Sequence, residues 1–465
     1  MEAEDQAAHY EQDPCGVSGA ALKVESIAEY GKRLRSKEVS AEEVTREFLD
    51  LIDERNPKLG AYTFVAREQA LVAAQAIDAL LRGGTDLGPL MGVPLAVKDL
   101  FYVDGMPTTA GSKADVADVV RVEGPFVRAL KRSGAIILGK TWTSEFALGG
   151  INFVQRVPWN PCDETVHRTP GGSSGGSAVA MAGGLCAFAI GSDTGGSVRM
   201  PAALCGVFGH KFSSTAFPLD GIFPLSPTLD SIGTFTASSE DAQLVWDTLS
   251  GKTRVHERGL RGLRLARPRQ LFYDELDAEV SERVERALKQ LEQAGAEIIN
   301  VDVPEIDEFE HVFGRIVPIE LIAILGRERV EQNLDRFDPV VRSRLGPGLD
   351  QKATEYIDAR LRLDELRKTV AEQMETCDAW ITPTTPLLPG PLQDYASLDA
   401  ALAWNRRALR NTRPGNVFDQ CGVSVPLRDN GAHLPVGLQI SCAPSQDGRL
   451  LAIARAIEHA LHPVN

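Results

Sequence analysis

The chain has 465 residues, of which 43% are hydrophobic, and its 49 basic and 64 acidic side chains give a formal net charge of −15. It therefore has ample material for a core. General binding to nucleic acid or to an anionic membrane is disfavoured, because both reward a basic surface. The seven cysteines are widely spread, without CxxC pairs or Cys/His clusters of metal-ligand spacing. We expect reduced thiols and no metal site.

The N-terminal segment, residues 1–24, is predicted to be a loose tail preceding one large domain over residues 25–465. The tail begins MEAEDQAAHYEQDP, which is acidic and lacks the apolar core of a secretory signal. No window of the chain has the apolar length needed to span a bilayer. We expect a cytoplasmic protein.

Helical and strand-like patterns alternate along the chain, as is typical of an α/β architecture. Helices are predicted from about Ser26, after the capping box formed by Ser40 and Glu43, and over 67–81, 125–133, 239–249, 280–291, most of 305–375 and 447–461. Buried strands are predicted over 93–97 and 134–139. Further strands are predicted over 263–266, 295–301, 379–382 and 435–440.

Two of the predicted strands end in a lysine. Lys98 and Asp99 close the strand over 93–97, and Lys140 follows the strand over 134–139. Such a lysine is usually an ordinary solvated charge, but charged groups at the carboxyl ends of α/β strands are often where ligands bind.

The stretch from Thr169 to Arg199 contains two glycine-serine runs, over 171–177 and 191–197. A flexible linker is disfavoured because apolar segments flank the stretch. A phosphate-binding loop is disfavoured because neither GxxxxGK[ST] nor GxGxxG is present. Close packing of a glycine-rich turn against a sheet would explain one run better than two.

Acyl transfer by a serine is the chemical alternative. A serine hydroxyl needs a base to remove its proton, and none of the eight histidines is tied by a motif to a nucleophilic serine. A lysine with a lowered pKa can serve instead. The residues before Ser197, from Thr194 to Gly196, offer unshielded N–H groups of the kind that form an oxyanion hole.

Three motifs closely resemble the amidase signature family. They are GVPLAVKD (92–99), TPGGSSGGSAVAMAGG (169–184) and GSDTGGSVRMPAALCGVFGHK (191–211), so the core motifs span 92–211. The wider similarity runs from about residue 25 to the C-terminus and weakens after residue 250, where its late part includes Asn416, Pro426 and residues 434–439. The resemblance implies a single large α/β domain with a mixed central sheet covered by helices on both faces.

The resemblance also implies a Ser-Ser-Lys triad without metal or cofactor. Ser197 would be the nucleophile, Ser173, held by a cis peptide, would relay the proton, and Lys98 would be the base. The backbone N–H groups of the oxyanion hole would belong to Thr194, Gly195 and Gly196. Supporting positions, for which a purely structural role is an equally good interpretation, are Ser174, Asp193 and Arg199.

The implied reaction is hydrolysis of a small-molecule carboxamide to a carboxylate and ammonia or an amine, by an enzyme that forms a homodimer in many such cases. Indoleacetamide-type and allophanate-type hydrolases have similar motifs. One alternative is the glutaminase subunit of a tRNA-dependent amidotransferase, from whose pattern the segment 212–233 departs. Another is a non-catalytic anion-binding module, which would not require Lys98 and Ser173.

The substrate pocket is expected to be formed by the loops 149–168 and 212–230 and by a variable helical region at about 305–410. Four aromatic residues there could form an apolar acyl pocket or belong to the core: Phe153, Trp159, Phe217 and Trp404. Three arginines could bind a substrate carboxylate but fit solvated helix charges better: Arg406, Arg407 and Arg410.

Overall fold

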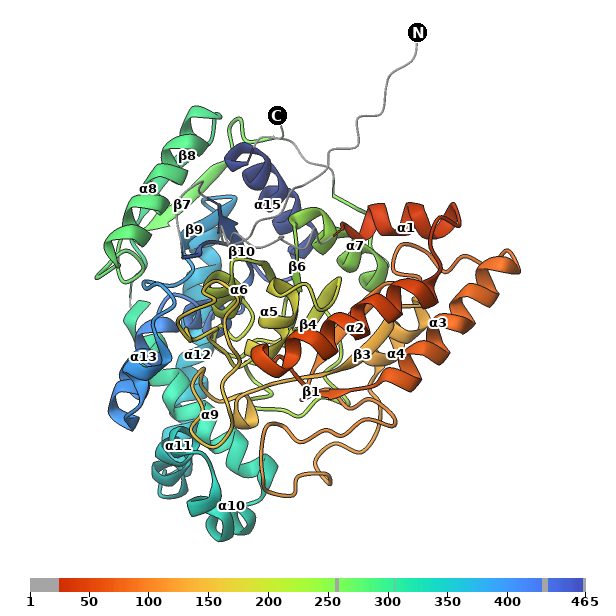
Figure 1. Ribbon diagram of the computed structural model, residues 1–465. Coiled ribbons are helices and arrows are strands. Elements are labelled where there is room, and N and C mark those ends of the chain that lie inside the picture. The colour runs from red at the N-terminus through yellow and green to blue at the C-terminus, as the bar shows by residue number, and fades with distance from the viewer. Residues whose placement is uncertain (1–24, 256–258, 305, 429–433, 463–465) are drawn as a thin grey trace.

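A computed structural model describes residues 25–255, 259–304, 306–428 and 434–462 (Figure 1). The predicted N-terminal tail over 1–24 lies outside the described residues. Within them, eleven strands form one mixed sheet in the order β1-β3-β2-β4-β6-β5-β10-β11-β9-β7-β8. The strands are β1 (Tyr62–Val65), β2 (Pro94–Lys98), β3 (Ile136–Thr141), β4 (Phe188–Ser192), β5 (Phe208–Lys211), β6 (Ile232–Thr236), β7 (Arg264–Pro268), β8 (Glu297–Val301), β9 (Ala379–Pro383), β10 (Cys421–Leu427) and β11 (Val436–Cys442).

Fifteen α-helices in the described residues surround this sheet. They are α1 (Ile27–Arg35), α2 (Ala41–Leu59), α3 (Arg67–Arg82), α4 (Pro125–Arg132), α5 (Gly175–Ala182), α6 (Arg199–Cys205), α7 (Ser239–Ser250), α8 (Ala278–Gln293), α9 (Phe309–Leu325), α10 (Arg327–Asn333), α11 (Pro339–Leu349), α12 (Ala353–Met374), α13 (Leu398–Ala408), α14 (Arg413–Val417) and α15 (Asp447–Leu461). The capping box predicted at Ser40 and Glu43 is present at the start of α2. No helix in the described ranges is long and apolar enough to cross a membrane.

Helices lie on both faces of the sheet, as predicted, and strand β5 shows why. Successive residues of a strand point to opposite faces. A Cβ added at Gly209 would lie 2.5 Å from the Cβ of Ala202 on α6, whereas the next side chain, His210, packs against Trp246 of α7. Glycine at position 209 therefore lets α6 approach the sheet closely, while the opposite face of β5 is covered by α7.

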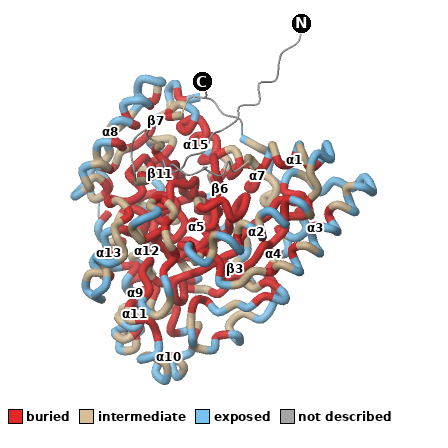
Figure 2. Tube along the Cα trace, in the orientation of Figure 1, coloured by how far each residue is buried: buried red, intermediate tan, exposed pale blue. Residues whose placement is uncertain are grey.

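Strands β2, β4 and β5 are buried along their whole length, and the centre of the molecule is mostly buried in Figure 2. Strand β2 pairs in parallel with β4, with Val97 opposite Ile190. Lys98 and Ser192 therefore end neighbouring strands at the same edge of the sheet. Helix α5 begins within the first glycine-serine run and α6 just after the second, so both helices start beside this edge.

The predicted helical region after residue 305 forms α9 to α12, and the predicted strands at 379–382 and 435–440 correspond to β9 and β11. Strands β1, β4, β5, β6 and β10 were not predicted. Helix α9 is also more buried than its charged neighbourhood indicated, since Val312, Ile316 and Leu321 are fully inaccessible to solvent. It packs against α11, α12 and α14.

Candidate active site

Lys98 ends β2 with its side chain fully buried. Its Nζ donates to Ser173 Oγ at 2.7 Å and to Ser192 Oγ at 2.9 Å. Burial lowers the pKa of Lys98 to about 7, and the nearby carboxylates of Asp193 and Asp230 only partly oppose this shift. Near neutral pH, a large fraction of this amine therefore carries a lone pair able to accept a proton.

Lys140, in the adjacent strand β3, is equally buried but differently partnered. Its Nζ forms an ion pair with Asp99 at 2.8 Å and donates to the Pro107 carbonyl and the Thr108 hydroxyl. Lys140 therefore has a structural environment, with a carboxylate to balance its charge. The side-chain partners of Lys98 are hydroxyls, which do not balance a charge.

Ser173 and Ser174 lie at the start of α5. The peptide bond between Gly172 and Ser173 is cis, in agreement with the expectation from the family resemblance. Ser174 Oγ donates to the Ser192 carbonyl at 3.1 Å and accepts from the Ser192 N–H at 3.3 Å. Ser174 thus joins the first glycine-serine run to the end of β4, and so fixes Ser173 relative to Lys98.

Ser197 precedes α6 and is 7% exposed. Its carbonyl accepts from the Ser174 N–H at 3.3 Å, which brings the two glycine-serine runs together. Among the described residues, Ser197 Oγ makes no hydrogen bond, to Ser173 or to any other group. The structure therefore joins Lys98 directly to Ser173 and places Ser197 beside them with an unengaged hydroxyl.

The backbone before Ser197 is held in an unusual conformation. The Gly196 N–H donates to Asp193 Oδ1 at 2.8 Å and is thus already engaged. Within the described chain, the N–H groups of Thr194, Gly195 and Ser197 have no acceptor. Gly196 has φ of +123°, and a Cβ added there would overlap the Thr412 hydroxyl. Only glycine fits this position.

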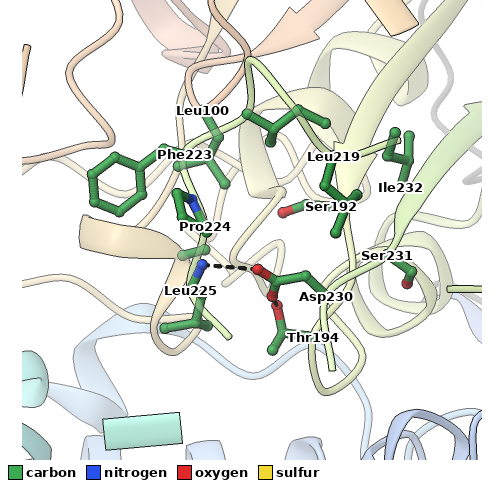
Figure 3. A pocket seen from close by; sticks show the side chains of 12 residues that line it. Leu100, Ser192, Thr194, Leu219, Phe223, Pro224, Leu225, Asp230, Ser231 and Ile232 are labelled. Atoms are coloured by element: carbon green, nitrogen blue, oxygen red, sulfur yellow. Dashed lines mark hydrogen bonds between the residues drawn. The ribbon is translucent and has the colours of Figure 1, made fainter. Parts of the chain in front are cut away.

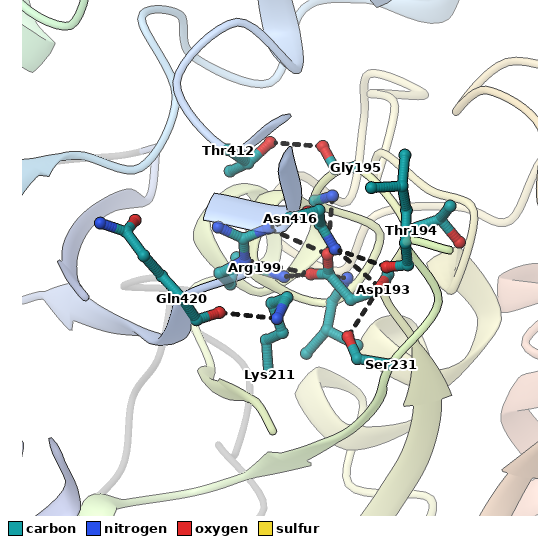
Figure 4. A network of polar contacts seen from close by, with 12 residues as sticks. Asp193, Thr194, Gly195, Arg199, Lys211, Ser231, Thr412, Asn416 and Gln420 are labelled. Carbon is teal, nitrogen blue, oxygen red and sulfur yellow. Dashed lines mark hydrogen bonds and ion pairs between the residues drawn. The ribbon is translucent and has the colours of Figure 1, made fainter. Parts of the chain in front are cut away.

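Asp193 and Arg199 form a fully buried ion pair, with Arg199 Nη2 2.9 Å from Asp193 Oδ1 (Figure 4). Asp193 also accepts from the N–H groups of Val198 and Arg199. Burial alone would raise the pKa of Asp193, but Arg199, Lys211 and the Val198 N–H outweigh it and hold that pKa far below its ordinary value. This carboxylate stays ionised and fixes the loop that carries Ser197.

Three residues from the C-terminal half complete this network. None of them was assigned a role from the sequence, although Asn416 and Gln439 lie in the late part of the family resemblance. Asn416 Oδ1 accepts from Arg199 at 2.6 Å, and its Nδ2 donates to the Asp193 carbonyl at 2.8 Å. Gln439 Oε1 accepts from Arg199 at 3.0 Å. The Thr412 hydroxyl donates to the Gly195 carbonyl at 2.9 Å. Thr412 and Asn416 lie in the polar stretch NRRALRNTRPGN (405–416), in which no local pattern distinguishes them from their neighbours.

A small pocket opens beside Ser192, the partner of Lys98, and beside Thr194 (Figure 3). Its other walls are mostly apolar and come from Leu100 and from residues 219–232. Asp230 lies in this wall and accepts from the Thr194 hydroxyl at 2.6 Å. Burial raises the pKa of Asp230 to about 6 despite hydrogen bonds from Thr194, Ser226 and Leu225. The sequence did not single out this aspartate.

The four aromatic residues that could line the pocket differ in their neighbours and in their exposure to solvent. Phe217 packs against Phe126, Phe212 and Trp246, and Trp159 stacks on His167, so both have structural neighbours. Phe153 is 38% exposed.

Trp404 is the aromatic candidate that lies close to the serines. A Cβ added at Gly150 would lie 3.0 Å from its ring, and another added at Gly172 would lie 2.9 Å from Gly150. Trp404 therefore borders the Ser173 side of the site.

Two of the three candidate arginines on or after α13 are engaged elsewhere. Arg407 forms an ion pair with Asp277 at 2.7 Å, and Arg410 donates to the Asp274 carbonyl. Arg406 is exposed. The interpretation of these three residues as helix charges rather than a carboxylate clamp agrees with this geometry.

Comparison with known proteins gives a family match over most of the chain. The family model described as Amidase matches residues 43–451. A 2-amino-5-chloromuconic acid deaminase from Comamonas testosteroni is 35% identical, covering 93% of this chain and 95% of that protein. A glutamyl-tRNA(Gln) amidotransferase subunit from Carboxydothermus hydrogenoformans is 32% identical, covering 93% of this chain and 96% of that protein. A crystal structure of an amidase superposes with a TM-score of 0.85 at 32% identity, covering 94% of this chain and 100% of that one.

The Asp193–Arg199 pair predicts a large loss of stability on removing one charge. Asp193→Asn leaves the Arg199 guanidinium buried without its counter-ion, so we expect the free energy of unfolding to fall by roughly 3–5 kcal/mol, measured by urea titration. Asp302→Asn removes a partner of the exposed Arg269 and serves as the control, with no measurable change expected. Equal stability of the two variants would contradict a structural role for the buried pair.

Proposed function

The chain belongs to the amidase signature family, and on that premise we propose that it hydrolyses the C–N bond of small, non-peptide carboxamides through a Ser197 acyl-enzyme. The observation that carries the proposal is the environment of Lys98. It is a buried amine with a pKa of about 7 whose side-chain partners are the hydroxyls of Ser173 and Ser192. A lysine in this state can act as a general base at neutral pH.

In the proposed first step, neutral Lys98 takes the proton of Ser173 as Ser173 takes the proton of Ser197. The Ser197 Oγ forms a bond to the amide carbon, and the carbonyl oxygen becomes an oxyanion. The unengaged N–H groups of Thr194, Gly195 and Ser197 are the donors available to that oxyanion. Gly196 contributes its backbone conformation instead, because its own N–H donates to Asp193.

Collapse of the tetrahedral intermediate breaks the C–N bond. The proton held by Lys98 returns through Ser173 to the departing nitrogen, which leaves as ammonia or an amine, and Ser197 remains acylated. A water molecule then attacks the acyl carbon, giving its proton to Lys98 along the same route. The bond to Ser197 breaks as the proton held by Lys98 returns through Ser173 to Ser197 Oγ, which restores the free serine and the neutral lysine. The carboxylic acid product gives its own proton to solvent and leaves as the carboxylate. All protons are carried by the chain's own groups and by water.

A glutaminase subunit of a tRNA-dependent amidotransferase is the second candidate, favoured by the similarity to the glutamyl-tRNA(Gln) amidotransferase protein. The two functions share the acyl-transfer steps but differ in substrate and in dependence on partners. A stand-alone hydrolase turns over simple amides as an isolated chain, whereas the second candidate requires glutamine as substrate and partner proteins for transfer. The segment 212–233 departs from the pattern of the glutaminase and favours the hydrolase.

We predict that Ser197→Ala abolishes turnover without changing the fold, because the nucleophile is lost while its loop remains fixed by Asp193. The measurement is ammonia release from a panel of aliphatic and aryl primary amides, carboxylated ureas and glutamine. The wild-type chain should also be labelled at Ser197 by a fluorophosphonate probe, and the variant should not. Activity near that of wild type in the variant would disprove the assignment, and a wild-type chain that binds anions without labelling or turnover would favour the non-catalytic alternative.

The lowered pKa of Lys98 predicts how activity depends on pH. Catalysis needs the neutral amine, whose fraction rises as pH increases through about 7. We expect kcat/KM to rise about tenfold per pH unit below that value and to level off above it.

The Asp230→Asn variant tests which group causes the rise of kcat/KM with pH, called here the acidic limb of the profile. The Asp230 charge raises the Lys98 pKa, so its removal should move the limb to lower pH without abolishing it. Lys98 would be excluded as the base if kcat/KM of the wild type did not change with pH across the Lys98 pKa, from about two pH units below it to about two above it. A limb that disappears in Asp230→Asn would assign it to the aspartate.

The conformation of Gly196 predicts a steric effect on catalysis. Gly196→Ala forces the backbone next to the nucleophile to move, because alanine disfavours φ of +123° and its Cβ would overlap Thr412. We expect kcat to fall by about 100-fold, since a displacement near ~1 Å has that cost. The Gly196→Ala/Thr412→Ala double variant relieves the overlap but not the backbone strain and should recover part of the activity. Unchanged kcat in Gly196→Ala would show that this backbone does not need its present conformation.

A further inference from the structure

The peptide unit that joins Thr194 to Gly195 lies in the turn before the proposed nucleophile. Within the described chain, neither the Thr194 carbonyl nor the Gly195 N–H has a hydrogen-bond partner. The units on either side are anchored. The Asp193 carbonyl accepts from the Ser231 N–H at 3.1 Å, and the Gly195 carbonyl accepts from the Thr412 hydroxyl at 2.9 Å. Since a peptide unit is planar and turns as a whole, the contacts of the Thr194 side chain also help to fix the direction of the Gly195 N–H.

The Thr194 side chain is attached to a buried carboxylate, that of Asp230 (Figure 3). The Thr194 hydroxyl donates to Asp230 Oδ1 at 2.6 Å. The other oxygen, Oδ2, accepts from the N–H groups of Leu225 and Ser226 at 2.9 and 3.0 Å. Because two backbone groups hold Asp230 independently of Thr194, the carboxylate is a fixed point to which the Thr194 hydroxyl is tied.

The loop that holds Asp230 is itself attached to helices α9 and α12. Glu320 on α9 accepts from the Ser226 hydroxyl at 2.5 Å and from the Thr228 N–H at 3.2 Å. The Tyr356 hydroxyl of α12 donates to the same carboxylate at 2.9 Å. Asp230 is therefore the inner end of a set of hydrogen bonds that begins on helices outside the sheet.

The bond between Thr194 and Asp230 lies beside the small pocket at Ser192. Thr194, Leu225 and Asp230 line this pocket together with Ser192, whose hydroxyl accepts from Lys98 Nζ at 2.9 Å. The bond therefore belongs to the wall of a cavity that also reaches the partner of the proposed base.

We propose that Asp230 is a positioning residue of the oxyanion hole. Through the Thr194 hydroxyl, it holds the peptide unit between Thr194 and Gly195 so that the Gly195 N–H points at the oxyanion formed when Ser197 attacks. A hydrogen bond weakens steeply as its angle departs from linearity, so a turned peptide unit stabilises the transition state less. The inference rests on the proposed acyl transfer and adds to it a residue that lies outside the three family motifs.

Thr194→Val tests the proposal, because valine keeps the branched shape of threonine and lacks the hydroxyl. We expect kcat for an amide substrate to fall roughly 10- to 100-fold with KM little changed, since the contact to the oxyanion exists only in the transition state. Complete loss of one donor costs about 10²–10³, and here the donor is displaced rather than removed. Thr194→Ser keeps the hydroxyl and should retain most of the activity.

Inhibition by phenylboronic acid distinguishes positioning from a loss of folded enzyme. Its boron accepts the Ser197 Oγ while the Ser197 proton passes through Ser173 to Lys98, and the tetrahedral anion places an oxygen in the oxyanion hole. The inhibition constant Ki and KM are both independent of the fraction of enzyme that is folded. In Thr194→Val, we expect Ki to rise by about the factor by which kcat falls, because the adduct resembles the transition state.

Thr236→Val is the matched control. Thr236 is fully buried at the far end of β6, where it pairs with Phe208, and its hydroxyl donates to the Ser238 carbonyl at 2.8 Å. The substitution therefore removes a buried threonine bond that does not involve the turn before Ser197. We expect it to lower the free energy of unfolding, as Thr194→Val does, but to leave kcat and Ki at their wild-type values.

A double-mutant cycle tests Asp230 itself. Thr194→Val should cost much less in the Asp230→Ala background than in wild type, because the hydroxyl has lost its acceptor there. Equal costs in the two backgrounds overturn the role of Asp230. Unchanged kcat and Ki in Thr194→Val, or an equal loss in Thr194→Ser, also overturn the inference, and these results do not require Asp230→Ala to fold.

Direct binding of phenylboronic acid separates this inference from the proposed function. Calorimetry measures that binding in wild type and in Thr194→Val without any substrate. Weaker binding in Thr194→Val supports the positioning role even if no amide is hydrolysed, in which case only the proposed reaction fails. Amide hydrolysis with unchanged kcat and Ki in Thr194→Val overturns the positioning role and retains the reaction. A wild-type chain that neither hydrolyses amides nor binds the boronic acid overturns both.

Discussion

Asp193 and Arg199 stand six residues apart, one just beyond the end of β4 and the other at the start of α6, and both are removed from water. Burying either charge without the other would cost much free energy, so the ion pair holds the turn between them in one conformation. That turn carries Ser197 and turns the N–H groups of Thr194 and Gly195 away from intramolecular acceptors. The same pair draws in residues of α14 and β11, so the C-terminal half of the chain supports a site whose reactive groups all come from the N-terminal half.

Much of the candidate site could be predicted from the sequence, because the residues proposed to react lie in compact motifs. Lys98 and Lys140 show where local patterns fail. Both lie at the end of a buried strand, and only the three-dimensional partners distinguish them, a carboxylate for Lys140 and two hydroxyls for Lys98. Ser192 was overlooked because it is one serine among several, and Asp230 because its link to Thr194 crosses 36 residues.

The alternation of helices and strands was sufficient to predict the α/β class of fold, and the family resemblance implied the mixed sheet with helices on both faces. Most of the strands that were missed contain a glycine, which weakens the strand pattern. β10 has the sequence CGVSVPL, in which a proline is also unfavourable, yet it is central, between β5 and β11. Glycine suits position 422 of β10 because the Arg199 side chain passes close over it: a Cβ added at Gly422 would lie 3.3 Å from Arg199 Cδ. Tertiary packing, which no local pattern encodes, decides such cases.

The parallel pairing of β2 with β4 holds Lys98 and Ser192 in the central sheet, whereas helices α9 to α11 come from a separate part of the chain and pack over the loops beside them. The contacts include Val340 against Gly149 and Phe313 against Gly195, and the Asp338 N–H at the start of α11 donates to Glu145. Side chains elsewhere on these helices can change without displacing the proposed catalytic groups in the sheet. Substrate specificity can therefore evolve through helices α9 to α11 while the groups proposed to break the bond are kept unchanged in the sheet.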